Sequence, residues 1–575
     1  MLDIEQSLNH KFPRFARSAP LLRRPTLSLL RKLAHENTIN QFLSEHQTAQ
    51  GIDFIERIFD HFNFNYSVAQ RERDNIPAEG RVVIVANHPI GSLDGLALIH
   101  LVSQVRPDVK IIANDLLNAF APLRELLLPL DNMTGRAYRQ SYKRIINALH
   151  DEQAVIVFPA GEVSRARPTG IKDGTWRSGF LHFARKTQSP LLPVFIQAKN
   201  SWLFYSASAV FKPLATALLA HEMFNKRSAE IRFRVGETIP ARALEAKNLA
   251  DKALTQRLKK HVYKLGRGKK TLFVTEKTIA HPEHPNRLQQ ELASAERLGE
   301  TRDGQTIYLC QWEQHPTVLR ELGRLRETAF RKVGEGTGRR RDLDRYDEHY
   351  QHLVLWDSKR LAIAGAYRIG VTRELVARQG LDGLYSAELF HLKPALRPYL
   401  DSALELGRSF VNPDYWGKAS LDYLWQGLGA YLNHHPDIRY LMGAVSLSAD
   451  YPRPLRDWLV VFHQRFYARP ETLAAARHPY LIEPETRMAM NGVFASLDRD
   501  TGYAQLQARF RESAQNLPVM FKHYPALFED NGYHLLAFSV DSDFGECLDG
   551  LFLADLDAMK PAKRKRYLQT RHNGL

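Results

Sequence analysis

Short apolar runs alternate with amphipathic segments between residue 81 and about residue 240. The apolar runs predict strands at 81–87, 109–115, 154–161, 190–197 and 230–237. Apolar residues recur at helical spacing between them, over 93–105, 138–151 and 176–187. This alternation predicts an α/β layer whose sheet is largely buried.

A second α/β unit begins at residues 306–312. Its further strands are expected at 352–357, 361–370, 403–411 and 439–448, with a helix over 420–435. No internal repeat relates the two units. The predicted fold class is therefore α/β, with two mixed-sheet α/β domains that follow an N-terminal helical region.

Composition divides the chain into four parts. Residues 1–75 have helical periodicity and suggest basic amphipathic helices that face either a membrane or solvent, through Lys11, Arg14, Arg17, Arg23, Arg24, Arg31 and Lys32. Residues 76–265 and 301–575 are the two predicted α/β domains, and 266–300, rich in prolines and charges, is the predicted linker. Strands are also expected at 491–497 and 533–542, although residues 475–575 suggest no task of their own.

Two apolar segments come closest to a membrane element. A spanning helix needs about 20 apolar residues, but residues 116–130 are interrupted by a proline and two charges. Residues 201–224 are divided near the middle by Lys212 and Pro213. The second segment predicts either a hairpin in the bilayer interface or a pair of core helices joined by a turn.

The charge of the chain indicates an anionic partner. Its 575 residues carry a formal net charge of +16, which suits nucleic acid, an anionic membrane face or an acidic carrier protein. The sequence has no zinc-finger spacing and no RNA-binding aromatic signature, so no nucleic-acid partner is predicted. Cys310 and Cys547 lie far apart, which excludes a disulfide framework and fits a reducing compartment. No export signal is recognised at the N-terminus.

The stretch NHPIGSLDG, from Asn87 to Gly95, follows the first predicted strand. An imidazole held by a carboxylate can take a proton from a hydroxyl as that oxygen attacks a carbonyl. His88 and Asp94 therefore suit acyl transfer without a covalent enzyme intermediate. A second loop, FPAGEVSR at 158–165, follows another predicted strand. Both loops should open on the same edge of the sheet, where α/β proteins bind ligands.

These two loops resemble the glycerolipid acyltransferase superfamily, which includes lysophosphatidic acid acyltransferase. That family has Asn-His, four residues and Asp in its first block, and Phe-Pro-Glu-Gly-Thr-Arg-Ser in its third. Here five residues separate His88 from Asp94, Ala160 replaces the glutamate, and residues 192–194 resemble the fourth block. The resemblance covers about residues 80–245. The five-residue spacing and the sequence FPAGE resemble the branch of this superfamily that contains ornithine-lipid O-acyltransferases and haemolysin-like proteins.

The resemblance implies roles for individual residues. His88 would be the base and Asp94 the residue that orients it. Gly161 would allow close backbone approach to the substrate, and Arg165 would meet an anionic group such as the phosphate of phosphopantetheine, unless it forms a surface salt bridge. Ala160 disfavours a glycerol-3-phosphate-type acceptor. The predicted substrate-binding residues of this domain are Asn87, Gly161, Glu162 and Arg165.

Residues 300–470 resemble the GNAT acyltransferase fold, in the branch of N-acyl-homoserine lactone synthases and ornithine N-acyltransferases. In the lactone synthases one element reads Glu-x-Ser-Arg, whereas here Gly407 takes the serine position. The residues that carry the resemblance are Arg326, Phe330, Asp342, Asp344, Asp347, Arg368, Glu405 and Arg408.

An amino acid acceptor offers an amine, a carboxylate and, in ornithine, a second ammonium group. Arg368 and Arg408 suit the carboxylate, and the acidic set Asp342, Asp344 and Asp347 suits an ammonium group. Glu405, directly or through water, would deprotonate the amine for attack on a thioester. An ion-pair network that holds the sheet edge is the alternative. The stretch GEGTGRRR at 334–341 predicts either a clamp for pantetheine phosphate or a disordered loop.

Together the two domains resemble the bifunctional ornithine lipid synthases of bacteria. That resemblance implies N-acylation of the ornithine α-amine by a 3-hydroxyacyl thioester in the C-terminal domain, then O-acylation of the new hydroxyl in the N-terminal domain. It implies acyl carrier protein, which is acidic, as donor, and lyso-ornithine lipid as intermediate. It also implies an anionic membrane surface as partner, peripheral attachment to the cytoplasmic face of the inner membrane, and no cofactor or metal.

Three alternatives stay open on the sequence. One is the synthesis of another amino-acid lipid by the same chemistry. Another is a phospholipid acyltransferase fused to an unrelated N-acyltransferase. The third is a noncatalytic membrane-binding or haemolysin-like protein that displays basic helices.

Overall fold

The computed structural model divides the chain into two compact units, residues 1–281 and residues 282–575, called here the first and second unit. Their boundary lies within the segment predicted as a linker. In the described part of the chain, no helix has the length and apolarity needed to cross a bilayer. The structure describes 35–113, 120–129, 136–167, 170–201, 204–205, 222, 230–245, 249–469 and 471–568, with Glu5, Leu27, Ser28, Arg31 and Lys32.

The first unit is built on a mixed seven-stranded sheet in the order β1-β9-β8-β2-β5-β3-β4. Every neighbouring pair is parallel except β8 with β9. All five strands predicted for this domain are present. The bounds are β1 (Asn65–Val68), β2 (Val82–Ala86), β3 (Val109–Ala113), β4 (Leu127–Pro129), β5 (Ala154–Val157), β8 (Leu191–Gln197) and β9 (Glu230–Val235).

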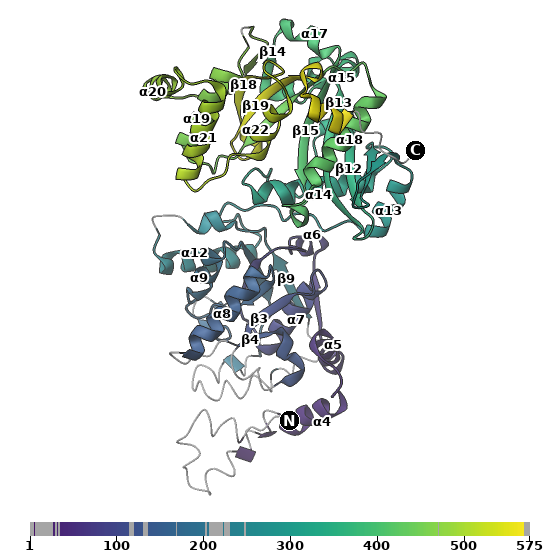
Figure 1. Cartoon of the computed structure of the whole chain (residues 1–575). Helices are drawn as coiled ribbons and strands as arrows, with labels where there is room; N and C mark the ends of the chain where they lie inside the picture. The colour runs from purple at the N-terminus through teal and green to yellow at the C-terminus, as the bar shows by residue number, and fades with distance from the viewer. Residues whose placement is uncertain are drawn as a thin grey trace. The chain divides into compact units, whose positions relative to one another are not determined.

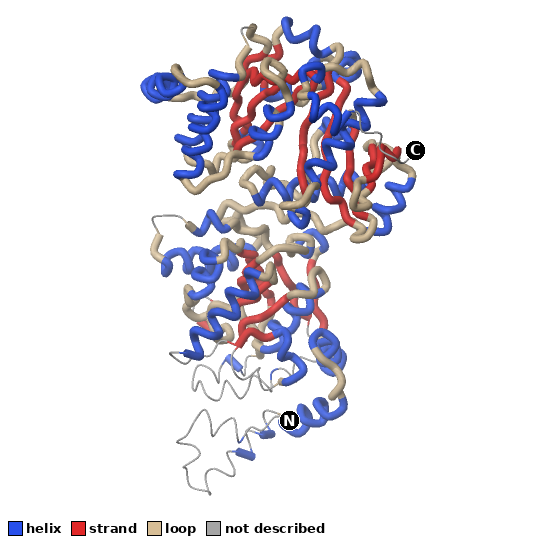
Figure 2. Tube along the Cα trace, in the orientation of Figure 1, coloured by secondary structure: helices blue, strands red, loops and turns tan. Residues whose placement is uncertain are grey.

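Helices cover both faces of this sheet. Strand β2 is apolar at every position, so it presents apolar side chains to both faces, and each face must be shielded from water. Val82, Ile84 and Ala86 pack into a core with residues of α5 (Gly51–Phe62) and α7 (Ser92–Ser103). Val83 and Val85 alternate to the opposite face and join a core with residues of α8, α9 and α12. Figure 2 shows the strands of this unit with helices around them. The bounds of the second set are α8 (Arg136–His150), α9 (Gly179–Lys186) and α12 (Asp251–Leu265).

The second unit has an eight-stranded sheet in the order β10-β11-β12-β13-β15-β16-β19-β18. Figure 1 labels β12, β13, β15, β18 and β19 of this sheet. All neighbours are antiparallel except β15 and β16, which are parallel. The predicted α/β class is correct for both units. The bounds are β10 (Glu296–Glu300), β11 (Thr306–Cys310), β12 (Gln351–Asp357), β13 (Ala362–Val371), β15 (Ala403–Val411), β16 (Tyr440–Leu447), β18 (Tyr533–Asp541) and β19 (Cys547–Asp555).

Helices of the second unit pack on both sides of its sheet. Apolar residues of α14 form one core with Val354 and Ala366, and those of α18, α19 and α21 form another with Leu353 and Leu355. The alternation along β12 therefore divides the two cores. These helices and the short helix that follows them are α14 (Pro316–Lys332), α18 (Ser420–His434), α19 (Arg453–Phe466), α21 (Arg499–Glu512) and α22 (Val519–His523).

The structure departs from the predicted elements in three places, and one further prediction is not tested. The strand expected at 491–497 is wrong, because α20 (Pro484–Phe494) covers most of it and buries Met490 and Phe494. The predicted linker contains α13 (Pro285–Ala293) and edge strand β10, whose charged residues hide its apolar signal. The predicted N-terminal helical region includes helix α4 (Glu36–Glu45) but also supplies β1 to the first sheet. Most of residues 201–224, where a hairpin was considered, lie outside the described residues.

Candidate active sites

The two loops that carry the chemistry of the first unit lie side by side. Strands β2 and β5 are parallel neighbours, so the loops that follow them meet at the same edge of the sheet, as the sequence predicts. The backbone N–H of Ser164 donates to the carbonyl of His88 at 2.7 Å. The imidazole of His88 stacks on the ring of Phe158, with centroids 4.2 Å apart.

His88 and Asp94 form a close pair. Nδ1 of His88 lies 2.9 Å from Oδ1 of Asp94, whose side chain is fully buried. The other carboxylate oxygen accepts backbone N–H groups of Ile90, at 2.9 Å, and Gly91, at 3.3 Å, at the beginning of α7. Asp94 is thus fixed by the helix terminus, and its carboxylate contacts Nδ1 of His88. The His88 side chain remains 20% exposed. This arrangement leaves Nε2 of His88 as the atom that can accept a proton.

The electrostatic balance around His88 favours the protonated ring. Burial lowers the pKa of His88, but the charge and hydrogen bond of Asp94, with the charge of Asp173, outweigh it, so that the pKa of His88 lies above its ordinary value of 6.5. An imidazole of raised pKa is a stronger base once it is deprotonated.

Asp173 is a residue of this site that the sequence analysis missed. Its carboxylate accepts the backbone N–H of His88 at 3.2 Å, the hydroxyl of Ser164 at 2.5 Å and the indole N–H of Trp176 at 2.8 Å. It therefore ties the loop after β2 to the loop after β5. The only local signal is the turn-forming Asp-Gly pair at residues 173–174, which gives no indication of the residues it contacts.

The other predicted substrate contacts of this unit divide into two kinds. The side-chain amide of Asn87 donates to the carbonyl of Ile196 and accepts its N–H, so Asn87 clamps β2 to β8, and its contact with substrate stays a prediction. Gly161 has φ +67, as the turn after Phe158 requires. Glu162 is exposed. Nε and Nη1 of Arg165 are buried without a hydrogen-bond partner among the described residues.

We expect O-acyl transfer to require deprotonated His88, so its rate should rise with pH and reach half its maximum above pH 6.5. The Asp94→Asn variant removes the charge that raises the pKa of His88, so the midpoint should move to lower pH. Rates of hydroxyl acylation measured from pH 5 to 9 test this prediction. An unmoved midpoint in Asp94→Asn would contradict the assignment of the titration to His88.

The predicted site residues of the second unit, apart from Glu405, form a buried ion-pair network with Arg326. Arg326 donates to Asp347 at 2.7 Å, and Arg368 donates to Asp344 at 2.6 Å and to Asp347 at 3.3 Å. Arg408 lies 3.0 Å from Asp342 and 3.4 Å from Asp344. The three acids predicted to bind an ammonium group are therefore already paired with arginines. Arg368 is fully buried and is not among the residues that line the cavity of about 400 Å³ described below, and its contact with substrate stays a prediction.

Glu405, the predicted general base, is engaged in hydrogen bonds within the second unit. Its carboxylate accepts the backbone N–H and hydroxyl of Ser386, at 2.7 and 2.5 Å, and the hydroxyl of Tyr350. The residue is 1% exposed and lies outside the cavity lining. One carboxylate oxygen is thus bonded to Ser386 and the other to Tyr350, and the role of Glu405 as general base stays a prediction.

A cleft opens where the parallel strands β15 and β16 stop pairing. Their ladder ends at Leu406 and Gly443, and residues 406–411 and 444–448 beyond it line a cavity of about 400 Å³. Between Gly407 and Phe410, β15 carries one residue more than β13, and Arg408 has φ +46. Such a bulge re-aims a side chain, and it places Arg408 in the cavity lining. Backbone groups that lose their strand partner here can bind the amides of an extended ligand.

Two acids that the sequence analysis did not select also line this cavity. Glu335 lies in the stretch predicted as a phosphate clamp or a disordered loop, and Asp549 lies on β19. Both are buried, at 8% and 5% exposure. Their distance from each other in the sequence concealed their proximity.

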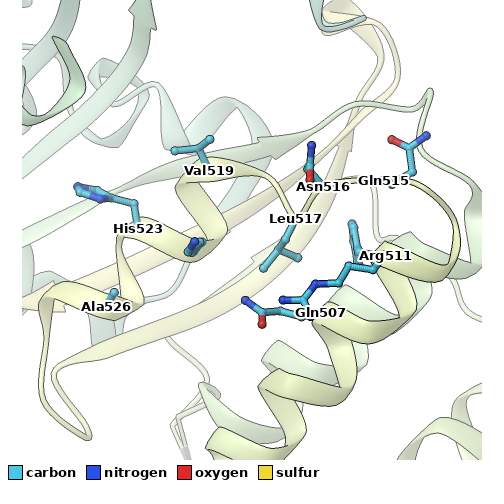
Figure 3. A pocket seen from close by; sticks show the side chains of 10 residues that line it. Gln507, Arg511, Gln515, Asn516, Leu517, Val519, His523 and Ala526 are labelled. Carbon is cyan, nitrogen blue, oxygen red and sulfur yellow. The ribbon is translucent and has the colours of Figure 1, made fainter. Parts of the chain in front are cut away.

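A second cavity, of about 610 Å³, borders the first. The two share Asn516, Leu517 and Val519, in the segment that leads into α22. Figure 3 shows Gln507 and Arg511 on the helix that faces this segment. Arg511 and Lys522 supply positive charge to its lining and are exposed.

Comparisons with known proteins agree with this division. A family model described as "Acyltransferase" matches residues 6–270, and one described as "Acetyltransferase (GNAT) domain" matches residues 325–426. A glycine N(alpha)-acyltransferase of Bacteroides thetaiotaomicron is 30% identical over 305 residues, which are 51% of this chain and 90% of that protein. The chain belongs to the acyltransferases. The GNAT resemblance recognised in its sequence is confirmed.

The names of two further relatives of this acyltransferase give substrates other than glycine. A lyso-glycine lipid O-acyltransferase of Bacteroides thetaiotaomicron is 30% identical over 272 residues, 46% of this chain and 97% of that protein. An L-ornithine N(alpha)-acyltransferase of Brucella abortus is 36% identical over 119 residues, 20% of this chain and 41% of that protein. The acyltransferase thus unites an acyltransferase domain and a GNAT domain, and the noncatalytic alternative is set aside.

Proposed function

We propose that this acyltransferase makes a diacylated amino-acid lipid in two steps. The GNAT domain joins a 3-hydroxyacyl chain to the α-amine of an amino acid, and the N-terminal domain then esterifies the new hydroxyl. The observation that carries the proposal is the His88–Asp94 pair at an accessible sheet edge, on the same chain as a GNAT domain with its own cavity. Names of relatives cover both N-acylation and O-acylation.

His88 performs the second step as a general base. Nε2 takes the proton of the 3-hydroxyl as its oxygen attacks the thioester carbonyl, and Asp94 stabilises the imidazolium that forms. Arg165, with two buried donors that lack partners among the described residues, suits the phosphate of a pantetheine arm. No step requires a metal or a cofactor.

We favour ornithine as the amino acid. N-acyltransferases of both glycine and ornithine are among the relatives, so glycine is the second candidate. The acidic residues in the cavity of the second unit, Glu335 and Asp549, support an acceptor with an additional ammonium group.

We favour acyl carrier protein as the acyl donor. The carrier is acidic and presents its thioester on a phosphopantetheine arm, and the net charge of this chain is +16. Arg511 and Lys522, beside the cleft, suit the phosphate of that arm. A basic enzyme whose first product is amphiphilic is also suited to peripheral attachment at the anionic cytoplasmic face of the inner membrane.

Lipid mass spectrometry tests the proposed function. Expression of the full chain in a bacterial host that makes no amino-acid lipid should produce a lipid with an amide-linked 3-acyloxyacyl group on ornithine. The head group and the number of chains are read in one spectrum. A glycine head group would select the second candidate, and an acylated glycerophospholipid as the only new product would contradict the proposal.

A further inference from the structure

The acceptor of an N-acyl transfer arrives as an ammonium ion, which must be bound and then deprotonated. Carboxylates are the side chains that do both. Asp342, Asp344 and Asp347 are occupied by arginines, and Glu405 is held by hydrogen bonds away from the cavity. Among the residues that line the cleft between β15 and β16, the carboxylates are those of Glu335 and Asp549.

The position of Glu335 is fixed by its neighbours. The preceding Gly334 has φ +80, and a Cβ there would collide with Asp450 and Ser448, so the loop packs closely on the segment after β16. The hydroxyl of Ser446 donates to the Glu335 carboxylate at 2.8 Å. Glu335 is therefore an ordered wall of the cleft, 8% exposed.

Asp549 lies on the same side of the cleft as Ser446. The two residues are directly paired in the antiparallel ladder of β16 and β19, which places their side chains on one face of the sheet. Asp549 is 5% exposed and lines the cavity. Among the described residues, its carboxylate accepts a weak hydrogen bond from the thiol of Cys547 at 3.5 Å.

The cleft holds more acid than base. Arg408 is the cation among its lining residues, and it is already paired with Asp342 and Asp344. Burial raises the pKa of Glu335 to about 7. Burial and the charges of Asp541 and Glu335 raise the pKa of Asp549 well above its usual range. A buried carboxylate becomes favourable as an ion when a cation is placed beside it.

We propose that Glu335 and Asp549 form the amine subsite of the GNAT domain, and that this subsite selects a diamino acid. Asp549 binds the side-chain ammonium group, which keeps its charge throughout the reaction. Glu335 faces the α-ammonium group and takes its proton. This inference rests on the proposed N-acylation and adds to it the residues that recognise the acceptor.

The proton balance of the step is simple. Glu335 removes one proton from the α-ammonium group, and the amine attacks the thioester carbonyl carbon. The C–N bond forms and the C–S bond breaks as the tetrahedral intermediate collapses. The second nitrogen proton passes to the leaving thiolate, and Glu335 releases the first proton to solvent. The products are the amide, the free thiol and one proton.

Several titratable groups surround Glu335, and all but one of them are acids or weak acids. Arg408 is the cation among the described residues that line the cleft with Glu335, and it is engaged by the aspartates of the network. A substrate ammonium group would thus supply the positive charge that balances the carboxylates of Glu335 and Asp549. The groups near Glu335 are Asp549 and Cys547 on β19, Tyr451 and Asp450 after β16, and Arg408 on β15.

A comparison of L-ornithine with L-norvaline tests the subsite, because norvaline has the same carbon chain without the second amine. The purified full chain is supplied with a 3-hydroxyacyl thioester, and kcat and KM are measured for each amino acid. The wild type should prefer ornithine. Asp549→Asn should lower kcat/KM for ornithine about 10- to 100-fold, mainly through KM, and leave norvaline unchanged. Retained norvaline acylation also shows that the variant is folded.

Glu335→Gln should lower kcat for both amino acids about 10²- to 10⁴-fold. It should also remove a rise of kcat/KM with pH near 7, which the wild type owes to Glu335. Asp543→Asn, which alters an exposed acid in the turn before β19, is the matched control and should match the wild type in every assay.

Three results would overturn the amine subsite while leaving N-acylation intact. They are equal wild-type use of the two amino acids, retained ornithine preference in Asp549→Asn, and an unchanged pH profile in Glu335→Gln. Acylation of neither amino acid would overturn the proposed function as well. A stoichiometric metal ion in the purified protein, lost in Asp549→Asn, would assign Asp541, Cys547 and Asp549 to a metal instead, since their ligand atoms lie within 4.8 Å of one another.

Discussion

Replacement of His88 with alanine is expected to abolish O-acylation and to leave N-acylation intact. Loss of a general base costs about 10²- to 10⁴-fold in rate, and no other described side chain is paired with Asp94 in the way that His88 is. Cells that express the His88→Ala variant should therefore accumulate the monoacylated amino-acid lipid. Mass spectrometry of extracted lipids measures the ratio of the monoacyl to the diacyl species.

The matched control for this variant is His182→Ala. His182 lies in the same unit on α9, and its side chain is 60% exposed, so its loss should leave the lipid ratio at the wild-type value. A diacyl lipid made at the wild-type rate by the His88→Ala protein would contradict the assignment of His88 as the base. Loss of both lipids would instead mean that the first unit is required for N-acylation.

Replacement of Asp347 with alanine is expected to destabilise the second unit by about 3–5 kcal/mol, which is the usual cost of breaking a buried ion pair from one side. Asp347 is fully buried, and it accepts hydrogen bonds from both Arg326 and Arg368, which are also buried. The substitution leaves two guanidinium groups without this partner. Denaturant unfolding followed by tryptophan fluorescence measures the change in the free energy of unfolding.

The exposed Asp557 provides the control for Asp347. Its side chain is 62% exposed beside Arg439, and Asp557→Ala should change stability by less than about 1 kcal/mol. Lowering the pH should destabilise the second unit in the same way as Asp347→Ala. Burial opposes the charge of Asp347, but the two arginines outweigh burial and lower its pKa, so its contribution is present above the pKa of the unfolded chain and is lost as pH falls. Equal changes in the free energy of unfolding for Asp347→Ala and Asp557→Ala would contradict the role of the network.

The fold and the first active site could largely be predicted because local patterns determine them. Apolar runs of strand length gave β2 and β5, and parallel strands carry their following loops to one edge. His88 and Phe158 thus meet as expected. The strand expected at 491–497 failed because apolar residues such as Phe494 satisfy a helix that packs on α19 equally well.

The second site could be predicted only in part because a sequence does not state which charges pair. Asp344 and Asp347 were recognised as site candidates, but their pairing with arginines was not predicted. The bulge at Arg408 depends on the register between two strands, which the sequence does not specify. Glu335 and Asp549 become neighbours only after β16 and β19 pair.

The two oxygens of the Asp94 carboxylate have different functions. One oxygen caps the beginning of α7, and the other orients His88. Truncation of this side chain would therefore fray a helix and disable a base at the same time, whereas asparagine can retain part of the cap. Folding of the first unit and its chemistry share a single carboxylate, so a loss of activity at this position has to be separated from a loss of structure.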